Sequence, residues 1–103
     1  MKSSKPKARV TGNAVRRRGE HYEALLLVSV PPDHKADRTE AAVRASKSVG
    51  PSSSVAVYLN DQRGEVRYAG DDRAAVAEAH TIGRDVAKSY LKQRGYSVGG
   101  SCA

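Results

Sequence analysis

Phenylalanine and tryptophan are absent from this sequence of 103 residues, and five tyrosines supply all of its large aromatic rings. Apolar residues of all kinds reach only 39%, below the usual range for globular proteins. A core must therefore be built mainly from Val, Leu, Ile, Ala and Tyr, and small side chains bury little apolar area each. We expect a single domain with one thin, two-layer core, because a chain of this length does not supply two cores.

Cysteine and long apolar runs are also scarce. Because Cys102 is the single cysteine, a disulfide framework within the chain is excluded. The longest apolar run, Ala24–Val28, has the length of a strand and not of a membrane span. The basic N-terminus lacks the apolar segment of a secretory signal; its composition fits a transit peptide better, but Pro6 and Gly12 interrupt the amphipathic helix that such a peptide forms. We predict a cytoplasmic protein with no membrane partner, with a transit peptide as the minority alternative.

Residue patterns that would carry catalysis, a metal ion or a cofactor are missing as well. The sequence contains neither a P-loop nor a GxGxxG fingerprint, and His21, His34 and His80 lack metal-ligand spacing. His80 is predicted to be an ordinary surface residue of a helix. The adjacent carboxylates at residues 71–72 suit a helix start, and the serines at 52–54 lack the glycines of a nucleophile elbow. We predict no enzyme, no catalytic residue, no metal, no cofactor and no small-molecule substrate.

Acidic residues are absent from the first nineteen positions, which read MKSSKPKARVTGNAVRRRG. The basic residues of this stretch are Lys2, Lys5, Lys7, Arg9, Arg16, Arg17 and Arg18. Residues 20–103 hold the other 11 of the 18 Lys and Arg and all 11 Asp and Glu, so the whole formal charge of +7 belongs to residues 1–19. Nucleic acid, or another anionic surface, is therefore the first partner to consider.

Apolar alternation and turn residues predict the strands. HYEALLLVSV, residues 21–30, has apolar side chains on both faces and is predicted to be the central strand. Residues 54–60 and 65–69 are predicted to form a hairpin around a loop that ends in glycine. Residues 9–19 alternate poorly and repeat cationic side chains, which is typical at best of an edge strand, with a turn at Gly19.

Two helices are predicted from their end signals. The first begins at a capping box, residues 37–40, and ends before Gly50. The second runs from Asp71 to about Arg94, with small residues along its apolar stripe. Gly83, in the middle of that stripe, indicates close approach of this helix to the sheet.

These elements predict an α+β domain in the order (β)-β-α-β-β-α, with a mixed sheet of three or four strands and two helices on one face. Residues 1–8 are predicted to be a flexible basic arm, residues 9–95 the domain, and residues 96–103 a loose tail.

The charge distribution favours a small nucleic-acid-binding or nucleoprotein-associated protein, in which the cations of residues 1–19 contact phosphates. Single strands are also recognised by aromatic stacking, and Tyr68 beside Arg67 is the best candidate for such a platform. Two alternatives stay open. The basic stretch is a solubilising tail or protects a sheet edge, and the tyrosines replace the missing Phe in the core.

The main rival is a protein-interaction module, a regulator or inhibitor that acts through the uncovered sheet face, a sheet edge or a homodimer contact. A sheet with helices on one side leaves its other face available. Tyr22, Tyr58, Leu25 and Leu27 are the candidate anchors for a protein partner.

Overall fold

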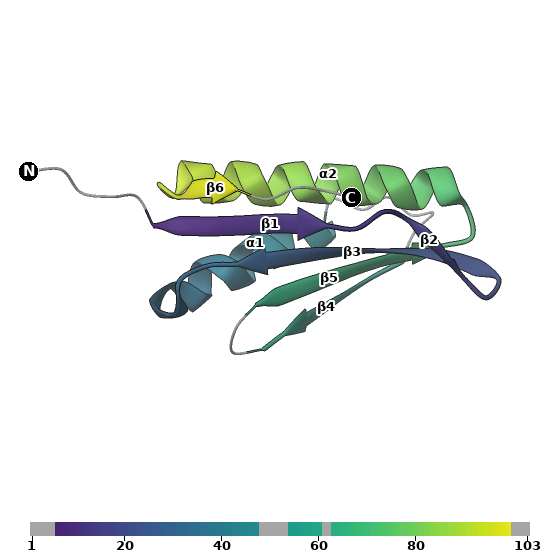
Figure 1. Cartoon of the computed structure of the whole chain (residues 1–103), viewed down its shortest axis with the longest axis horizontal. Coiled ribbons are helices and arrows are strands. Elements are labelled where there is room, and N and C mark those ends of the chain that lie inside the picture. The colour runs from purple at the N-terminus through teal and green to yellow at the C-terminus, as the bar shows by residue number, and fades with distance from the viewer. Residues whose placement is uncertain (1–5, 48–53, 61–62, 100–103) are drawn as a thin grey trace, which may run out of the picture.

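The longest strand, β3 (His21–Ser29), lies in the middle of the sheet, as its apolar pattern predicts. Our computed structural model describes residues 6–47, 54–60 and 63–99 (Figure 1). Ala24, Leu26 and Val28 of β3 are buried, whereas Leu25 and Leu27 on the other face are half-buried. The central strand therefore has one face in the core and one face with only partial cover.

Five further strands complete the sheet: β1 (Lys7–Gly12), β2 (Arg16–Arg18), β4 (Ser54–Leu59), β5 (Gly64–Gly70) and β6 (Ser97–Gly99). The order is β4-β5-β3-β1-β6, and β2 pairs with β3 beside the end of β1. The pairing of β1 with β6 is parallel and the other described pairings are antiparallel. Helices α1 (Lys35–Lys47) and α2 (Arg73–Gln93) pack on the sheet (Figure 1). The predicted α+β class is confirmed, and the described residues form six strands where three or four were expected.

Both ends of the domain extend further than the sequence predicts. The flexible arm is wrong for Lys7 and Ala8, which belong to β1, and Ala8 is only 2% exposed. The loose tail is wrong for residues 96–99, because Tyr96 is buried and the backbone N–H of Ser97 donates to the carbonyl of Pro6 at 2.9 Å. Residues 7–9 and 97–99 pair with each other. Each stretch is therefore ordered by the other end of the chain, and its own local pattern does not predict a strand.

The edge strand predicted over residues 9–19 is wrong in part, since this stretch forms two strands, of which only β2 lies at an edge among the described strands. β1 lies inside the sheet, between β3 and β6, and β2 pairs with β3 alone among the described strands. Between β1 and β2, Asn13 makes the hydrogen bonds to β3 that a strand residue would make. Its Oδ1 accepts from the backbone N–H of Leu25 at 3.0 Å, and its backbone N–H donates to the Leu25 carbonyl at 3.3 Å. The side-chain amide thus bridges the break before β2.

α2 has the predicted bounds, whereas α1 does not. Asp72 caps α2 by accepting from the backbone N–H of Ala74 at 2.9 Å, and Gly95, with a φ of 92°, follows its end. α1 begins at Lys35 after a short 3-10 turn, so the capping box predicted at residues 37–40 is wrong. The predicted end of α1 at Gly50 lies outside the described residues. None of the described helices is long and apolar enough to cross a membrane.

Gly83 brings α2 close to the sheet, as its place in the apolar stripe predicts. A Cβ atom at Gly83 would lie 1.8 Å from the hydroxyl oxygen of Tyr68. Tyr68 is fully buried, and its hydroxyl donates to the backbone carbonyl of Ala45 in α1 at 3.3 Å. The core therefore uses a tyrosine where a phenylalanine is missing, and glycine provides the space for its hydroxyl group.

Candidate nucleic-acid interface

The sheet has a covered face, against the helices, and an open face on the other side. We define the open face by the side chains that alternate with the buried ones: Lys7, Arg9, Thr11, Arg16, Arg18, His21, Glu23, Leu25, Leu27, Ser29, Ser54, Ala56, Tyr58, Glu65, Arg67 and Ala69. Five of them are Lys or Arg and two are Glu, so the open face has an excess of positive charge.

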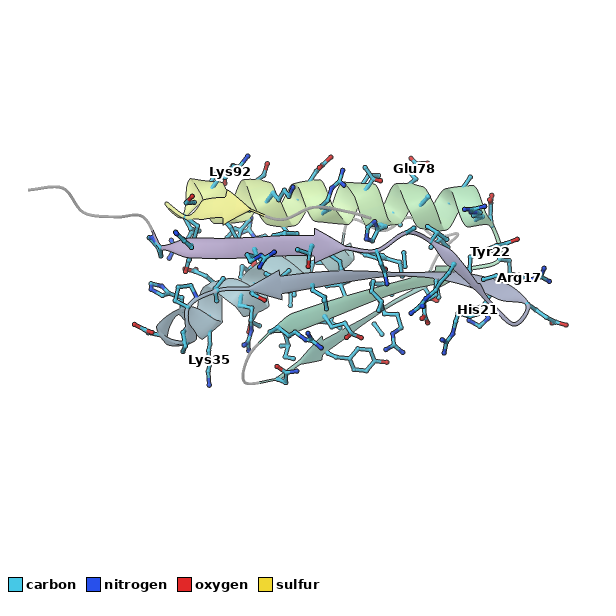
Figure 2. All side chains as sticks on the ribbon, viewed as in Figure 1. Arg17, His21, Tyr22, Lys35, Glu78 and Lys92 are labelled. Atoms are coloured by element: carbon cyan, nitrogen blue, oxygen red, sulfur yellow. The ribbon has the colours of Figure 1, made fainter. Side chains whose placement is uncertain are left out.

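The hairpin of β2 with the start of β3 carries the arginine cluster, Arg16–Arg18, at one end of the molecule (Figure 1). Gly19 has a φ of 64°, which makes the tight turn between the strands possible without strain. The register places Arg16 opposite Glu23 and Arg18 opposite His21, so these two arginines share the open face. Arg17 extends from the other side of the hairpin, and its Nε donates to the carbonyl of Gly19 at 3.0 Å (Figure 2).

Lys7 and Arg9 lie at the other end of the open face, on β1. Both are exposed, whereas Ala8 and Val10 between and beyond them are buried, so the alternation of β1 aims the two cations outward. Pairing with β6 holds this end of β1 in the sheet. Lys2 and Lys5 lie outside the described residues.

Arg67 of β5 lies across β3 from both groups of cations and is ion-paired. Its Nη2 is 3.0 Å from Glu65 and its Nε is 3.9 Å from Glu23. The hydrogen bond with Glu65 raises the pKa of the Arg67 guanidinium further, so this group stays charged. Its Cζ also lies 5.1 Å from the ring centroid of Tyr58, which is 52% exposed. Arg67 is therefore ion-paired with both glutamates of the open face, and its guanidinium lies over the exposed ring of Tyr58.

Tyr68, the predicted stacking residue, lies on the covered face. It is 0% exposed and pairs in register with Ala24 and Val55, so its ring cannot meet a base. Burial raises the pKa of its hydroxyl. The alternative assignment, a tyrosine that replaces Phe in the core, describes it correctly. The alternation of β5 contains this signal, because Tyr68 shares the face of Val66 and Arg67 does not.

His80 is not the surface residue that the sequence predicts. It is 5% exposed, and its Nε2 lies 2.8 Å from the backbone carbonyl of Leu25, beside the break between β1 and β2. Burial lowers the pKa of the imidazole, and the charge of Arg84 lowers it further. The Leu25 carbonyl therefore has two partners, the N–H of Asn13 and the His80 ring, and this contact explains the place of His80 without catalysis.

Asp37 has a structural partner set that the sequence did not indicate. Its carboxylate accepts hydrogen bonds from the hydroxyl of Tyr96 at 2.7 Å, the hydroxyl of Tyr90 at 3.2 Å and Nε of Arg94 at 3.1 Å. The bond from Tyr96 is the largest cause that holds the pKa of this carboxyl below its ordinary value. Asp37 therefore ties α1 to the end of α2 and to the segment that leads into β6.

Chemistry of other kinds has little support in the described part of the chain. The residues described there contain no group of three His, Cys, Asp or Glu side chains that could hold a metal ion. A groove of about 370 Å³ lies between the helices, lined by Arg44, Ile82, Asp85, Val86, Ser89, Tyr90 and Gln93. Arg44 there is already paired with Glu40 at 2.8 Å and lies over Tyr90, so the groove has no unpaired cation for a phosphate.

No protein-family model matches the chain, and no curated protein matches its sequence.

Proposed function

We propose that this protein is a small, non-enzymatic nucleic-acid-binding or nucleoprotein-associated protein, whose basic N-terminal segment contacts phosphates. The observation that carries the proposal is the cluster Arg16–Arg18, three exposed arginines on an ordered hairpin. Contacts with phosphates provide affinity through counterion release, without choice of sequence. A hairpin anchored in the sheet gives those contacts a defined orientation.

The state of the cations supports this proposal. Within the described residues, Lys7, Arg9 and Arg16–Arg18 form no ion pair with an acidic side chain, whereas Arg44, Arg67 and Arg94 each do. A cation without an internal partner is available to a phosphate at no cost in broken ion pairs. The described cations of the N-terminal segment therefore have both the charge and the accessibility that backbone binding needs.

The experiment is a titration of a labelled duplex and a labelled single strand with the whole protein at several salt concentrations. If seven phosphates are contacted on duplex DNA, the slope of log K against log salt is about −6. Replacing Arg16, Arg17 and Arg18 together by Thr should weaken binding and bring the slope to about −4, because each lost contact removes about 0.9 from it.

The matched control replaces three exposed cations of the helices, Lys47, Arg73 and Lys92, by Gln. Both triple variants lower the formal charge of +7 by three, so they lose the same charge at different places. The control should keep most of the affinity. Equal losses in the two variants would show that net charge and not the hairpin is responsible, and affinity that is insensitive to salt would contradict the proposal altogether.

A second candidate, a protein-interaction module, has one observation in its favour. β4 pairs with β5 alone among the described strands, and its sequence SVAVYL contains no charged residue and no Pro. Sheet edges are usually protected by such residues, so an unprotected edge suits pairing with another strand. Tyr58 and Leu59 are 52% and 46% exposed there, and Leu25 and Leu27 lie on the open face, whereas Tyr22 belongs to the covered face.

Molecular mass in solution separates the two candidates. Sedimentation at low and high salt, with and without nucleic acid, reports whether a stable dimer exists. A salt-independent dimer that Ala56→Lys converts to a monomer favours the interaction module, because a charge on β4 blocks edge pairing. A monomer that gains mass only with nucleic acid at low salt favours our proposal.

A further inference from the structure

We infer that the open face binds single-stranded nucleic acid, with an unpaired base stacked on Tyr58 and the phosphates on Arg16 and Arg18. This inference rests on the proposed function and specifies its ligand. It adds residues that the charge count does not include, because Tyr58 and Arg67 lie outside the basic N-terminal segment.

Tyr58 is the tyrosine available for stacking among the five. Tyr68 and Tyr96 are buried, and Tyr90 donates its hydroxyl to Asp37. Tyr22 packs against the core from the covered face, beside Arg17 at the hairpin (Figure 2). Tyr58 alone is more than half exposed, at 52%.

The surroundings of Tyr58 suit a nucleotide. The guanidinium of Arg67 lies over one face of the Tyr58 ring, with Cζ 5.1 Å from the centroid, so a base would stack on the other face. Aromatic rings stack on any base, and cations beside them add attraction for base and phosphate. The half-buried Leu25 and Leu27 provide apolar surface next to this pair.

The register connects Tyr58 with the arginine cluster across the sheet. Tyr58 pairs with Glu65, Arg67 pairs with Leu25, and Arg16 pairs with Glu23. Tyr58, Arg67 and Arg16 therefore follow a diagonal over four neighbouring strands, about 20 Å long by strand spacing and rise. A single strand of about four nucleotides has the length of such a site.

The charge along this diagonal is favourable for phosphates. The acidic side chains on it, Glu23 and Glu65, are only 13% and 22% exposed and both face Arg67. The accessible groups are therefore the ring of Tyr58, the edge of Arg67 and the arginines of β2. Such a surface complements an anionic backbone with unstacked bases.

A duplex would use the protein differently. Its bases are stacked inside the helix, and a protein ring can stack only on a base that is unpaired. The β2–β3 hairpin has the form of a two-stranded ribbon, which fits a major groove, but such docking leaves Tyr58 without a role. Tyr58 therefore distinguishes the two modes of binding.

The experiment compares labelled oligo(U), oligo(dT) and a duplex of mixed sequence in direct titrations with the full chain. Tyr58→Leu keeps an apolar side chain and removes the ring, and should weaken binding of the single strands about 5- to 150-fold. Tyr58→Phe keeps the ring and should bind like the unchanged protein. Leu59→Ala is the local control, because Leu59 is the next residue of β4, is 46% exposed and points to the covered side.

Each outcome decides the inference. A loss of single-strand affinity in Tyr58→Leu, with duplex affinity unchanged and with Tyr58→Phe and Leu59→Ala unaffected, supports it. The inference is overturned if Tyr58→Leu binds single strands as tightly as the unchanged protein does. It is also overturned if the unchanged protein binds the duplex more tightly than the single strands. In both cases the proposed contact of the hairpin with phosphates would still stand. Absence of binding to all three probes overturns both this inference and the proposed function.

Discussion

The two faces of the sheet differ in what they do. The covered face is apolar and so closely packed that one added atom would clash, as the contact of Tyr68 with Gly83 shows. The open face carries five cations, two paired glutamates and one well-exposed tyrosine, and no described helix covers it. Covered-face residues should therefore determine stability, and open-face residues should determine binding with little effect on folding.

Gly83→Ala should have the largest effect on stability. The added Cβ would lie 1.8 Å from the hydroxyl oxygen and 2.8 Å from Cζ of Tyr68, so the helix or the ring must move. We expect a loss of about 3 kcal/mol in the free energy of unfolding, measured by urea denaturation. In the background of Tyr68→Phe the cost should be smaller but not zero, because the hydroxyl clash is gone and the ring remains. Equal costs in both backgrounds would show that the contact is not the cause.

Asp37→Ala should come next. The substitution leaves the hydroxyls of Tyr90 and Tyr96 without their acceptor, and Tyr96 is only 3% exposed. Hydrogen bonds to a charged group contribute about 1.5–3 kcal/mol, and we expect a loss in that range. Hydrogen exchange should locate the loss at β6 and the start of β1, which Tyr96 helps to hold. Exposed Asp85→Ala is the control, and a loss as large there would contradict this reasoning.

His80 should make a smaller contribution to stability than Gly83 or Asp37, and this contribution should depend on pH. Its folded-state pKa is lowered, mainly by burial, from the ordinary value of 6.5. The unfolded chain therefore binds a proton first, and stability should fall as the pH drops below about 6.5 toward the folded-state pKa. His80→Gln should reduce the difference in urea midpoint between about pH 7.5 and pH 5.5. An unchanged difference in this variant would assign the pH dependence to other groups.

The smallest effect on stability is expected from the open face. Arg16, Arg17 and Arg18 are exposed and form no ion pair with a described acidic residue. Their joint replacement by Thr, a good strand former, should change the free energy of unfolding by no more than about 0.5 kcal/mol. The same protein should lose nucleic-acid affinity in the salt titration. A large drop in thermal stability would instead show that the arginine cluster contributes to folding, and that stability is not confined to the covered face.

The local sequence pattern predicts those helices and strands that have clear apolar periodicity and end signals of their own. β3 and α2 follow from apolar periodicity and end signals, and the role of Gly83 follows from its place in a stripe of small residues. Local pattern misses the start of β1 and all of β6, because these two strands pair with each other from opposite ends of the chain. β2 consists of three exposed arginines and has no apolar alternation to mark it. Asp37 shows the same limit, since its local sequence looks like a helix cap while its partners lie more than fifty residues away.

For the candidate interface, the sequence by itself determined the charge. All of the net charge of +7 lies in residues 1–19, whatever the fold. The tertiary structure decided which of those cations share a face, that Tyr58 accompanies them and that Tyr68 does not. The physical reason is that charge is a property of each residue, whereas the face on which a strand residue points depends on its register with neighbouring strands and on which side the helices cover.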